Sequence, residues 1–250
     1  MADIRDVIEA FVGPSIAEEM ARQYNPYQIG WMQEYAYRLG EASDRPQVEY
    51  RAYVLPGDTI NALAIPGGNV YIYEGALAKF DKRVISGLIG HEIAHVAKRD
   101  CMNNVIAVYG MDFLLSMYGQ GRARDMADLV TKILWRSYGR DREFEADIGS
   151  IHYNQRADLW PYGIKYLLEW LLSVEERPED SIKEFIYNLT ATHPPAAERL
   201  DRVNAEIAAL GIAEKTLLLE KLKAALPWLI ALGIGGGIAA LLIHRARKKK

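Results

Sequence analysis

Residues 81–100 read DKRVISGLIGHEIAHVAKRD, and their apolar side chains recur at the three- and four-residue spacing of a helix. His91 and His95 are four residues apart, so both imidazoles project from one helix face, about 6 Å from each other. That separation suits two ligands of one tetrahedral zinc ion. Glu92 lies about 100° round the helix, where its carboxylate can take a proton from an attacking water and return it to a leaving amine. The stretch therefore predicts a zinc-dependent hydrolytic site with Glu92 as the catalytic base.

Two histidines leave the coordination of such an ion incomplete, so a third protein ligand is required. The best source is Arg142-Glu143-Phe144-Glu145-Ala146-Asp147, which lies in a second helical pattern. Glu143 and Asp147 share a helix face, so Glu143 can ligate the metal while Asp147 accepts the second ring N–H of His91. The other charged residues of this segment are expected on a solvated face: Arg140, Asp141, Arg142 and Glu145.

The remaining histidines and the single cysteine offer weaker alternatives. His152, nine residues beyond Glu143, is a rival third ligand, but we favour a surface or core-edge position for it. His193 precedes Pro194-Pro195 and is either the residue before a proline-led helix or a catalytic donor to the oxyanion of the scissile carbonyl. Cys101 is expected to be a small core residue, because no partner for a nucleophilic thiol is evident.

The surrounding sequence predicts mostly helices and one small sheet. Residues 4–40 have a helical pattern that Gly13-Pro14 interrupts, and residues 47–55 alternate like a strand. Pro66-Gly67-Gly68 predicts a sharp turn before a second strand at Asn69–Tyr73.

After the first metal helix, residues 104–118 are apolar but short, which indicates a core or interfacial helix, and residues 119–127 suggest a loop. A long helical pattern follows from Ala127 to Ala157, with Gly139 as its weak point. Further helices are expected at 160–175 and from Pro194 to about Gly211.

Composition limits the class of protein. The chain has 250 residues, half of them hydrophobic, which is enough for one sizeable core. A net charge of −3 is too small to indicate a nucleic-acid partner. With one cysteine, an intrachain disulfide or a multi-cysteine metal site is excluded.

These motifs together resemble a known family, the gluzincin-clan zinc metallopeptidases that include HtpX and the CAAX prenyl endopeptidases. The matching elements occur in the family's order: Asn61-Ala62, Pro66-Gly67-Gly68, Gly90 to His95, Arg142 to Asp147, and Thr192-His193-Pro194 with Arg199. The resemblance implies a gluzincin-like domain with Glu143 as third ligand and Asp147 behind a ligand histidine. It also implies a substrate-binding sheet edge along the strand after Gly68, where a peptide adds as an extra strand. That edge would comprise Gly68, Asn69, Val70 and Tyr71.

Family members such as HtpX carry several membrane helices, whereas this chain has at most one. We therefore expect a compact member that acts in protein quality control, and prenyl-protein processing is not carried over.

The segment 224–243 has twenty residues without a charge, followed by the basic tail HRARKKK. Its length is that of a single membrane helix, Trp228 suits an interface, and Gly233 and Gly237 have the spacing of a helix-dimer contact. A buried core helix is the alternative. The basic tail prefers the cytosol, which would place the catalytic domain on the other side of the membrane. The first residues, MADIRDVIEAFVG, show no export signal, however. We therefore expect a cytosol-facing catalytic domain.

The resulting prediction is an α+β, predominantly helical metallopeptidase domain over residues 1–211, with N-terminal helices in 1–46 and the catalytic core in 47–211. Residues 212–250 would form a linker, the membrane helix 224–243 and the tail. The expected function is membrane-anchored endoproteolysis with one Zn²⁺ per chain, polypeptide substrates and no nucleic acid. Two alternatives are a non-catalytic zinc-binding adaptor and a latent protease in which residues 104–126 cover the site.

Overall fold

The computed structural model describes residues 3–134, 139–175 and 196–211. The chain forms two compact units, residues 1–204 and 205–250; of the second, only the end of α11 and the turn at Gly211 lie in the described part. The predictions for His193 and for the segment 224–243, with Gly233 and Gly237, therefore fall outside the described residues.

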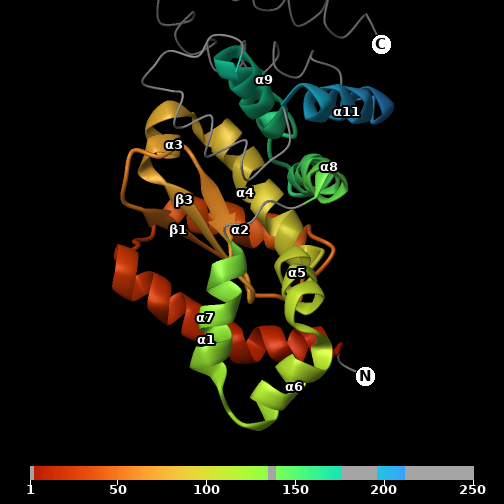
Figure 1. Ribbon diagram of the computed structural model, residues 1–250. Coiled ribbons are helices and arrows are strands. Elements are labelled where there is room, and N and C mark those ends of the chain that lie inside the picture. The colour runs from red at the N-terminus through yellow and green to blue at the C-terminus, as the bar shows by residue number, and fades with distance from the viewer. Residues whose placement is uncertain (1–2, 135–138, 176–195, 212–250) are drawn as a thin grey trace, which may run out of the picture. The chain divides into compact units, whose positions relative to one another are not determined.

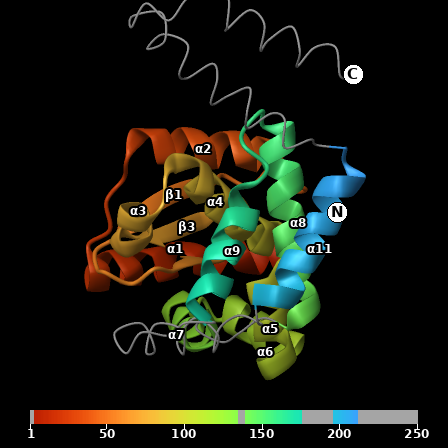
Figure 2. The ribbon, with the colours of Figure 1, turned by 90° about the horizontal axis from the view of Figure 1, so that it is seen from above.

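The described part of the chain is predominantly helical with one small sheet, as the sequence predicts. The elements, in chain order, are α1 (Ile4–Tyr24), α2 (Gly30–Glu41), β1 (Arg51–Leu55), β2 (Ala62–Ala64), β3 (Asn69–Tyr73), α3 (Glu74–Lys79), α4 (Lys82–Ala97), α5 (Asp100–Tyr109), α6 (Met111–Gly119), α7 (Ala123–Leu134), α8 (Arg140–Arg156), α9 (Gly163–Glu175) and α11 (Ala196–Ala209). Figures 1 and 2 show α4 between the sheet on one side and α8 on the other.

The three strands have the order β1-β3-β2. β1 runs parallel to β3, with Tyr53 opposite Tyr71, and β2 pairs antiparallel with β3 through the turn at residues 66–68. Gly67 and Gly68 both have positive φ in this turn, which is where glycine avoids the strain that a side chain would cause. The turn and the second strand were both predicted.

The position of β3 corrects the predicted substrate edge. β3 has a partner strand on each side, so its backbone is used within the sheet, and the edge next to α4 is β2. Val70 and Tyr71 are buried in the core, while a side chain at Gly68 would overlap Glu49. The set Gly68, Asn69, Val70 and Tyr71 is therefore not a peptide-binding edge.

Helix α1 also differs from its prediction. It continues through Gly13-Pro14 and ends at Asn25, which adopts the left-handed conformation of a helix cap. Gly13 has another use, because a side chain there would overlap the Pro66 carbonyl. The glycine thus allows α1 to pack closely on the β2–β3 turn, and Ile8, Val12 and Ile16 are fully buried.

The apolar segment after the metal helix forms two helices in place of one. α5 and α6 meet at Gly110, whose φ of 81° breaks the helix, and α7 begins at Ala123, inside the predicted loop. Leu114, Met117 and Met126 pack with α1 in one core cluster, which also contains the buried Cys101, as expected for a core cysteine. In this arrangement α5–α7 are packing partners of α1.

Among the described residues, no helix has both the length and the apolar composition needed to cross a membrane.

Candidate metal centre

Helices α4 and α8 approach each other closely through small residues. A side chain at Gly90 would crowd Ser150 and Asn154, and one at Gly149 would crowd Ala94. Ser150 Oγ donates a hydrogen bond to the Gly87 carbonyl at 2.6 Å. This contact brings the first turn of α8 alongside the middle of α4.

The close approach brings His91, His95 and Glu143 together. One ligand atom from each lies within 4.8 Å of the others, and all three side chains are buried. The two Nε2 atoms are 3.1 Å apart, Glu143 Oε2 is 3.5 Å from His91 Nε2, and Glu143 Oε1 is 3.5 Å from His95 Nε2. Ligand atoms at the corners of a tetrahedron round zinc, with bonds of about 2.0–2.1 Å, lie about 3.3 Å apart. The three side chains therefore fit one zinc ion.

Both imidazoles are oriented by a carboxylate at the opposite ring nitrogen. Asp147 Oδ1 lies 2.9 Å from His91 Nδ1, the contact that the sequence predicts. Asp100 Oδ2 lies 2.8 Å from His95 Nδ1, and this partner was not predicted. When each Nδ1–H is donated to its carboxylate, the Nε2 lone pairs face the same point. Two lone pairs that face each other in a buried site favour a shared cation.

The surrounding carboxylates also raise the proton affinity of both imidazoles. Burial lowers the pKa of His95, but hydrogen bonds to Asp100 and Glu143 outweigh it and raise the pKa to about 10. The pKa of His91 is raised in the same way, with burial opposed by Asp147 and Glu143. A cation at this point is therefore favoured whether it is a proton or a metal ion.

Arg199 on α11 supports the Asp147 side of the site. Its Nε and Nη2 donate to Asp147 Oδ2 and Oδ1 at 2.8 and 2.7 Å, and Nη1 lies 3.5 Å from Glu143 Oε2. Burial raises the pKa of Asp147, but the Arg199 charge and hydrogen bonds outweigh it, so the pKa lies below its usual value. Asp147 is thus held as a carboxylate, the form that can orient His91 through its Nδ1 at 2.9 Å.

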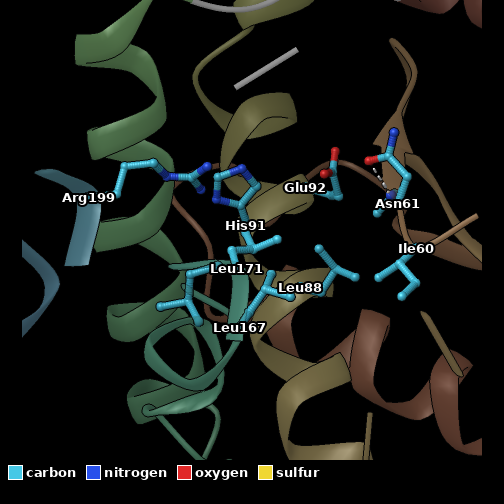
Figure 3. Close-up of a pocket in the computed structure, with 10 residues that line it drawn as sticks. Ile60, Asn61, Leu88, His91, Glu92, Leu167, Leu171 and Arg199 are labelled. Atoms are coloured by element: carbon cyan, nitrogen blue, oxygen red, sulfur yellow. Dashed lines mark hydrogen bonds between the residues drawn. The ribbon is translucent and has the colours of Figure 1, made fainter. Parts of the chain in front are cut away.

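The Glu92 side chain lines a hollow beside these ligands. Figure 3 shows the Arg199 guanidinium directed toward His91 on one side, with Glu92 and Asn61 on the other. Apolar side chains form the opposite wall of the hollow, which has about 430 Å³ of space, part of it open to solvent. The wall comprises Ile60, Leu88, Ile164, Leu167 and Leu171.

A second, smaller hollow lies where the end of α4 meets the β2–β3 turn, and its lining also includes Glu9, Arg99 and Cys101. It is lined by Ala64, Ile65 and Pro66 on the β2 side and by His95 and Val96 on α4. The first hollow touches β2 at Ala62 and α4 at Glu92. Each hollow thus touches both β2 and α4, and each includes one of the two histidines.

A model of peptidase family M48 matches residues 26–207, a segment that includes both helices of the site. The chain belongs to peptidase family M48. Its resemblance to HtpX-like metallopeptidases is thereby confirmed, and as an M48 member the chain is a metalloprotease.

Curated M48-type relatives are similar at low identity. Metalloprotease YcaL of Escherichia coli (strain K12) is 26% identical over 177 residues, covering 68% of this chain and 66% of YcaL. Protease HtpX of Legionella pneumophila (strain Corby) is 24% identical over 235 residues, covering 76% of this chain and 79% of that protein. Metalloprotease LoiP of Escherichia coli (strain K12) is 24% identical over 181 residues, covering 70% and 68%. The M48 chain thus matches about two thirds of YcaL and LoiP.

Outside the metal centre, the described residues include one further histidine and the charged residues of the segment that carries Glu143. His152 is half-buried on α8 and is not among the residues that surround the metal position. Arg140 and Glu145 are exposed, as expected for a solvated face. Arg142 is different, because its guanidinium donates to the Asp100 carbonyl at 3.2 Å and to Asn104.

Asp100 and Arg199 are the site residues whose contacts the sequence did not predict. Asp100 is five residues beyond His95, at the start of α5, and Arg199 is 52 residues beyond Asp147. Arg199 belongs to the family motif, which indicated that the residue matters. The motif did not indicate that its partner is Asp147.

Proposed function

We propose that the chain is a zinc-dependent endopeptidase in which His91, His95 and Glu143 hold one zinc ion and Glu92 is the general base. The observation that carries the proposal is the convergence of three buried ligand atoms next to Glu92, at the mouth of a hollow. Asp147 and Asp100 hold the two imidazoles in the tautomer that ligates through Nε2. Membership of family M48 supports the same chemistry.

When bound, zinc supplies a Lewis acid that polarises the scissile carbonyl and acidifies the attacking water. Glu92 takes the proton from that water and delivers it to the leaving amine. The carboxylate is only 4% exposed but lines the hollow, so it can reach a substrate while bulk water is largely kept away. Arg199 keeps Asp147 ionised, and Asp147 keeps His91 oriented throughout the reaction.

The substrate path follows the edge of β2. An extended peptide placed beside Ala62–Ala64 would pair with the free side of that strand and pass over Glu92 and the histidines. Main-chain pairing binds peptides without strong side-chain selectivity. The apolar wall of the larger hollow, which includes Leu167 and Leu171, adds a preference for an apolar side chain next to the scissile bond.

We also propose that residues 224–243 anchor the protease to a membrane, with the catalytic domain on the cytosolic face. Twenty uncharged residues before a basic tail support this assignment. Substrates in protein quality control, including membrane proteins, fit a protease with loose side-chain selectivity near a bilayer.

The test is casein cleavage by zinc-loaded wild type and by Glu92→Gln, with bound zinc measured in the same samples. Glu92→Gln should keep its zinc but cleave at least a hundredfold more slowly, because a positioned general base contributes about 10²–10⁴ in rate. Glu169→Gln is a matched control, since this carboxylate is 44% exposed on the same helix as the apolar wall. Cleavage by Glu92→Gln at the wild-type rate would contradict the proposed mechanism.

A further inference from the structure

The carboxylate that orients His95 depends on a strained turn. Helix α4 ends at Ala97, and α5 begins at Asp100, whose side chain reaches back to His95 Nδ1 at 2.8 Å. Between them Arg99 has a φ of 58°, a left-handed backbone conformation that residues other than glycine seldom adopt. The conformation of this turn therefore determines where the Asp100 carboxylate lies.

Helix α1 holds this turn through two arginines. Arg99 donates from Nε and Nη2 to Asp6 Oδ1 at 2.9 and 2.6 Å. Arg45 donates from Nη1 to the Val96 carbonyl at 2.9 Å, and from Nη2 to Asp6 Oδ1 and Glu9 Oε2 at 2.6 and 2.8 Å. Asp6 is the shared acceptor, so one side chain of α1 connects both arginines to the end of the metal helix.

The network lies largely inside the protein. The side chains of Arg45 and Glu9 are 7% and 5% exposed, that of Arg99 is 17% exposed, and that of Asp6 is 32% exposed. Solvent screens such pairs much less than it screens surface pairs. Without Asp6, Arg45 would keep only Glu9 as a counter-charge, and the nearest carboxylate to Arg99 would be Asp3, at 3.7 Å. The loss of Asp6 should therefore change the conformation of the turn before Asp100.

We propose that α1 positions His95 for its metal, because Asp6 holds the turn that carries Asp100. This inference rests on the proposed zinc site. α1 precedes residues 26–207, the segment that the M48 model matches, so the family match itself assigns no part in the site to this helix. Asp6 and Arg99 are positioning residues, since they act through Asp100.

The first test compares the zinc dissociation constant of wild type and Asp6→Ala, by competition with a chelating dye. Loss of a residue behind a metal ligand typically weakens metal binding 10- to 100-fold, so we expect about a tenfold loss for Asp6→Ala. The visible absorption of the cobalt-loaded protein should change as well, because the His95 orientation changes. Glu18→Ala is the control, since Glu18 is 70% exposed on the same helix and, among the residues that the structure describes, its ion pair is with Arg124, at 3.8 Å.

A second variant, Arg99→Gly, removes the guanidinium while glycine accepts the positive φ without strain. It should weaken zinc binding like Asp6→Ala, and it replaces Asp6→Ala should that variant not fold. If the helix acts through Asp100, Asp6→Ala should weaken zinc binding less than twofold in an Asp100→Asn background. A full tenfold effect in that background would overturn the proposal.

A purely structural network would give another result. Asp6→Ala and Arg99→Gly would then unfold more easily without metal, yet bind zinc as tightly as wild type and show its cobalt spectrum, and the proposal would be wrong. Wild-type protein that binds no zinc would instead overturn the proposed metal site.

Discussion

The two histidines at the metal centre are oriented in different ways. His91 is held by Asp147, which comes from another helix and is itself held by Arg199 on a third. His95 is held by Asp100, the first residue of α5, which follows the short turn after α4. The first imidazole thus depends on how three helices pack, and the second on one turn.

Zinc binding should release a proton from His95. At pH 7.5 the metal-free imidazole is protonated, because its pKa is raised to about 10, whereas a zinc ligand must be neutral. The apparent affinity for zinc should therefore rise about tenfold per pH unit for each proton released, from about pH 7 to pH 9. Calorimetry in buffers with different ionisation heats counts these protons.

The same pKa gives the sign of a stability effect. A raised pKa means that protonated His95 stabilises the metal-free fold below about pH 6.5, and this contribution is lost as the pH rises toward 10.

The prediction of proton release has a clear contradicting outcome. An affinity for zinc that does not change from pH 6.5 to 9, with no proton released, would show that the imidazole is neutral before the metal binds.

At the residue scale, the sequence predicts those contacts that helical spacing determines. His91 and His95, and Glu143 and Asp147, are each four apart on a helix, and the structure brings all four side chains together. Asp100 and Arg199 follow no such spacing, since Asp100 begins α5 after a turn and Arg199 lies on α11. Their partners become visible only when the packing of α4, α8 and α11 is known.

At the element scale, the contact between α4 and α9 shapes the apolar wall of the larger hollow. A side chain at Gly87 would overlap the backbone of Gly163 and Ile164. The absence of both side chains lets α9 approach until Leu167 and Leu171 line the hollow. The wall is thus placed by two glycines that touch no substrate.

Gly87→Ala should lower the free energy of unfolding by about 1–3 kcal/mol, because a methyl group forced into a packed contact displaces the backbone. Cleavage of peptides with a small apolar residue should fall more than cleavage of peptides with a larger one, since α9 moves away from Glu92. Denaturant unfolding and a peptide series measure the two effects.

Gly119→Ala is the matched control for this change. Its position in α6 has no neighbouring atom within 4 Å, so alanine there should leave stability unchanged or raise it by up to about 1 kcal/mol. Equal stability for Gly87→Ala and Gly119→Ala would mean that α4 and α9 do not pack as closely as described.

Sequence patterns predicted the existence of most elements but not how the strands are ordered. The run Asn69–Tyr73 was correctly predicted as a strand. Its place between β1 and β2 depends on pairing with both strands, and the alternation of apolar and polar residues within one strand does not indicate its partners. Likewise Pro14 marked a break that α1 does not have, because packing of Gly13 on the Pro66 turn favours a continuous helix. Tertiary contacts decided both cases.

At the scale of the whole molecule, the chain separates into units of residues 1–204 and 205–250. The residues of the metal centre and of its supporting network all belong to the first unit.

The proposed membrane anchor is tested by fractionation. The full chain should stay with membranes after alkaline carbonate washing, since about twenty apolar residues suffice to span a bilayer. A chain ending at residue 223 should appear in the supernatant and keep its zinc. Release of the full chain by carbonate would show that residues 224–243 do not span the membrane.

The central claim is that His91, His95 and Glu143 hold one zinc ion. The role of Glu143 as third ligand is the most specific element of this claim. Zinc content and affinity should be measured for wild type, Glu143→Gln and Glu145→Gln, the last being a control two residues away whose side chain is 60% exposed. We predict one zinc per chain for wild type and Glu145→Gln, and loss of tight binding for Glu143→Gln, because an amide is a poorer zinc ligand than a carboxylate. Wild-type affinity in Glu143→Gln would contradict the account.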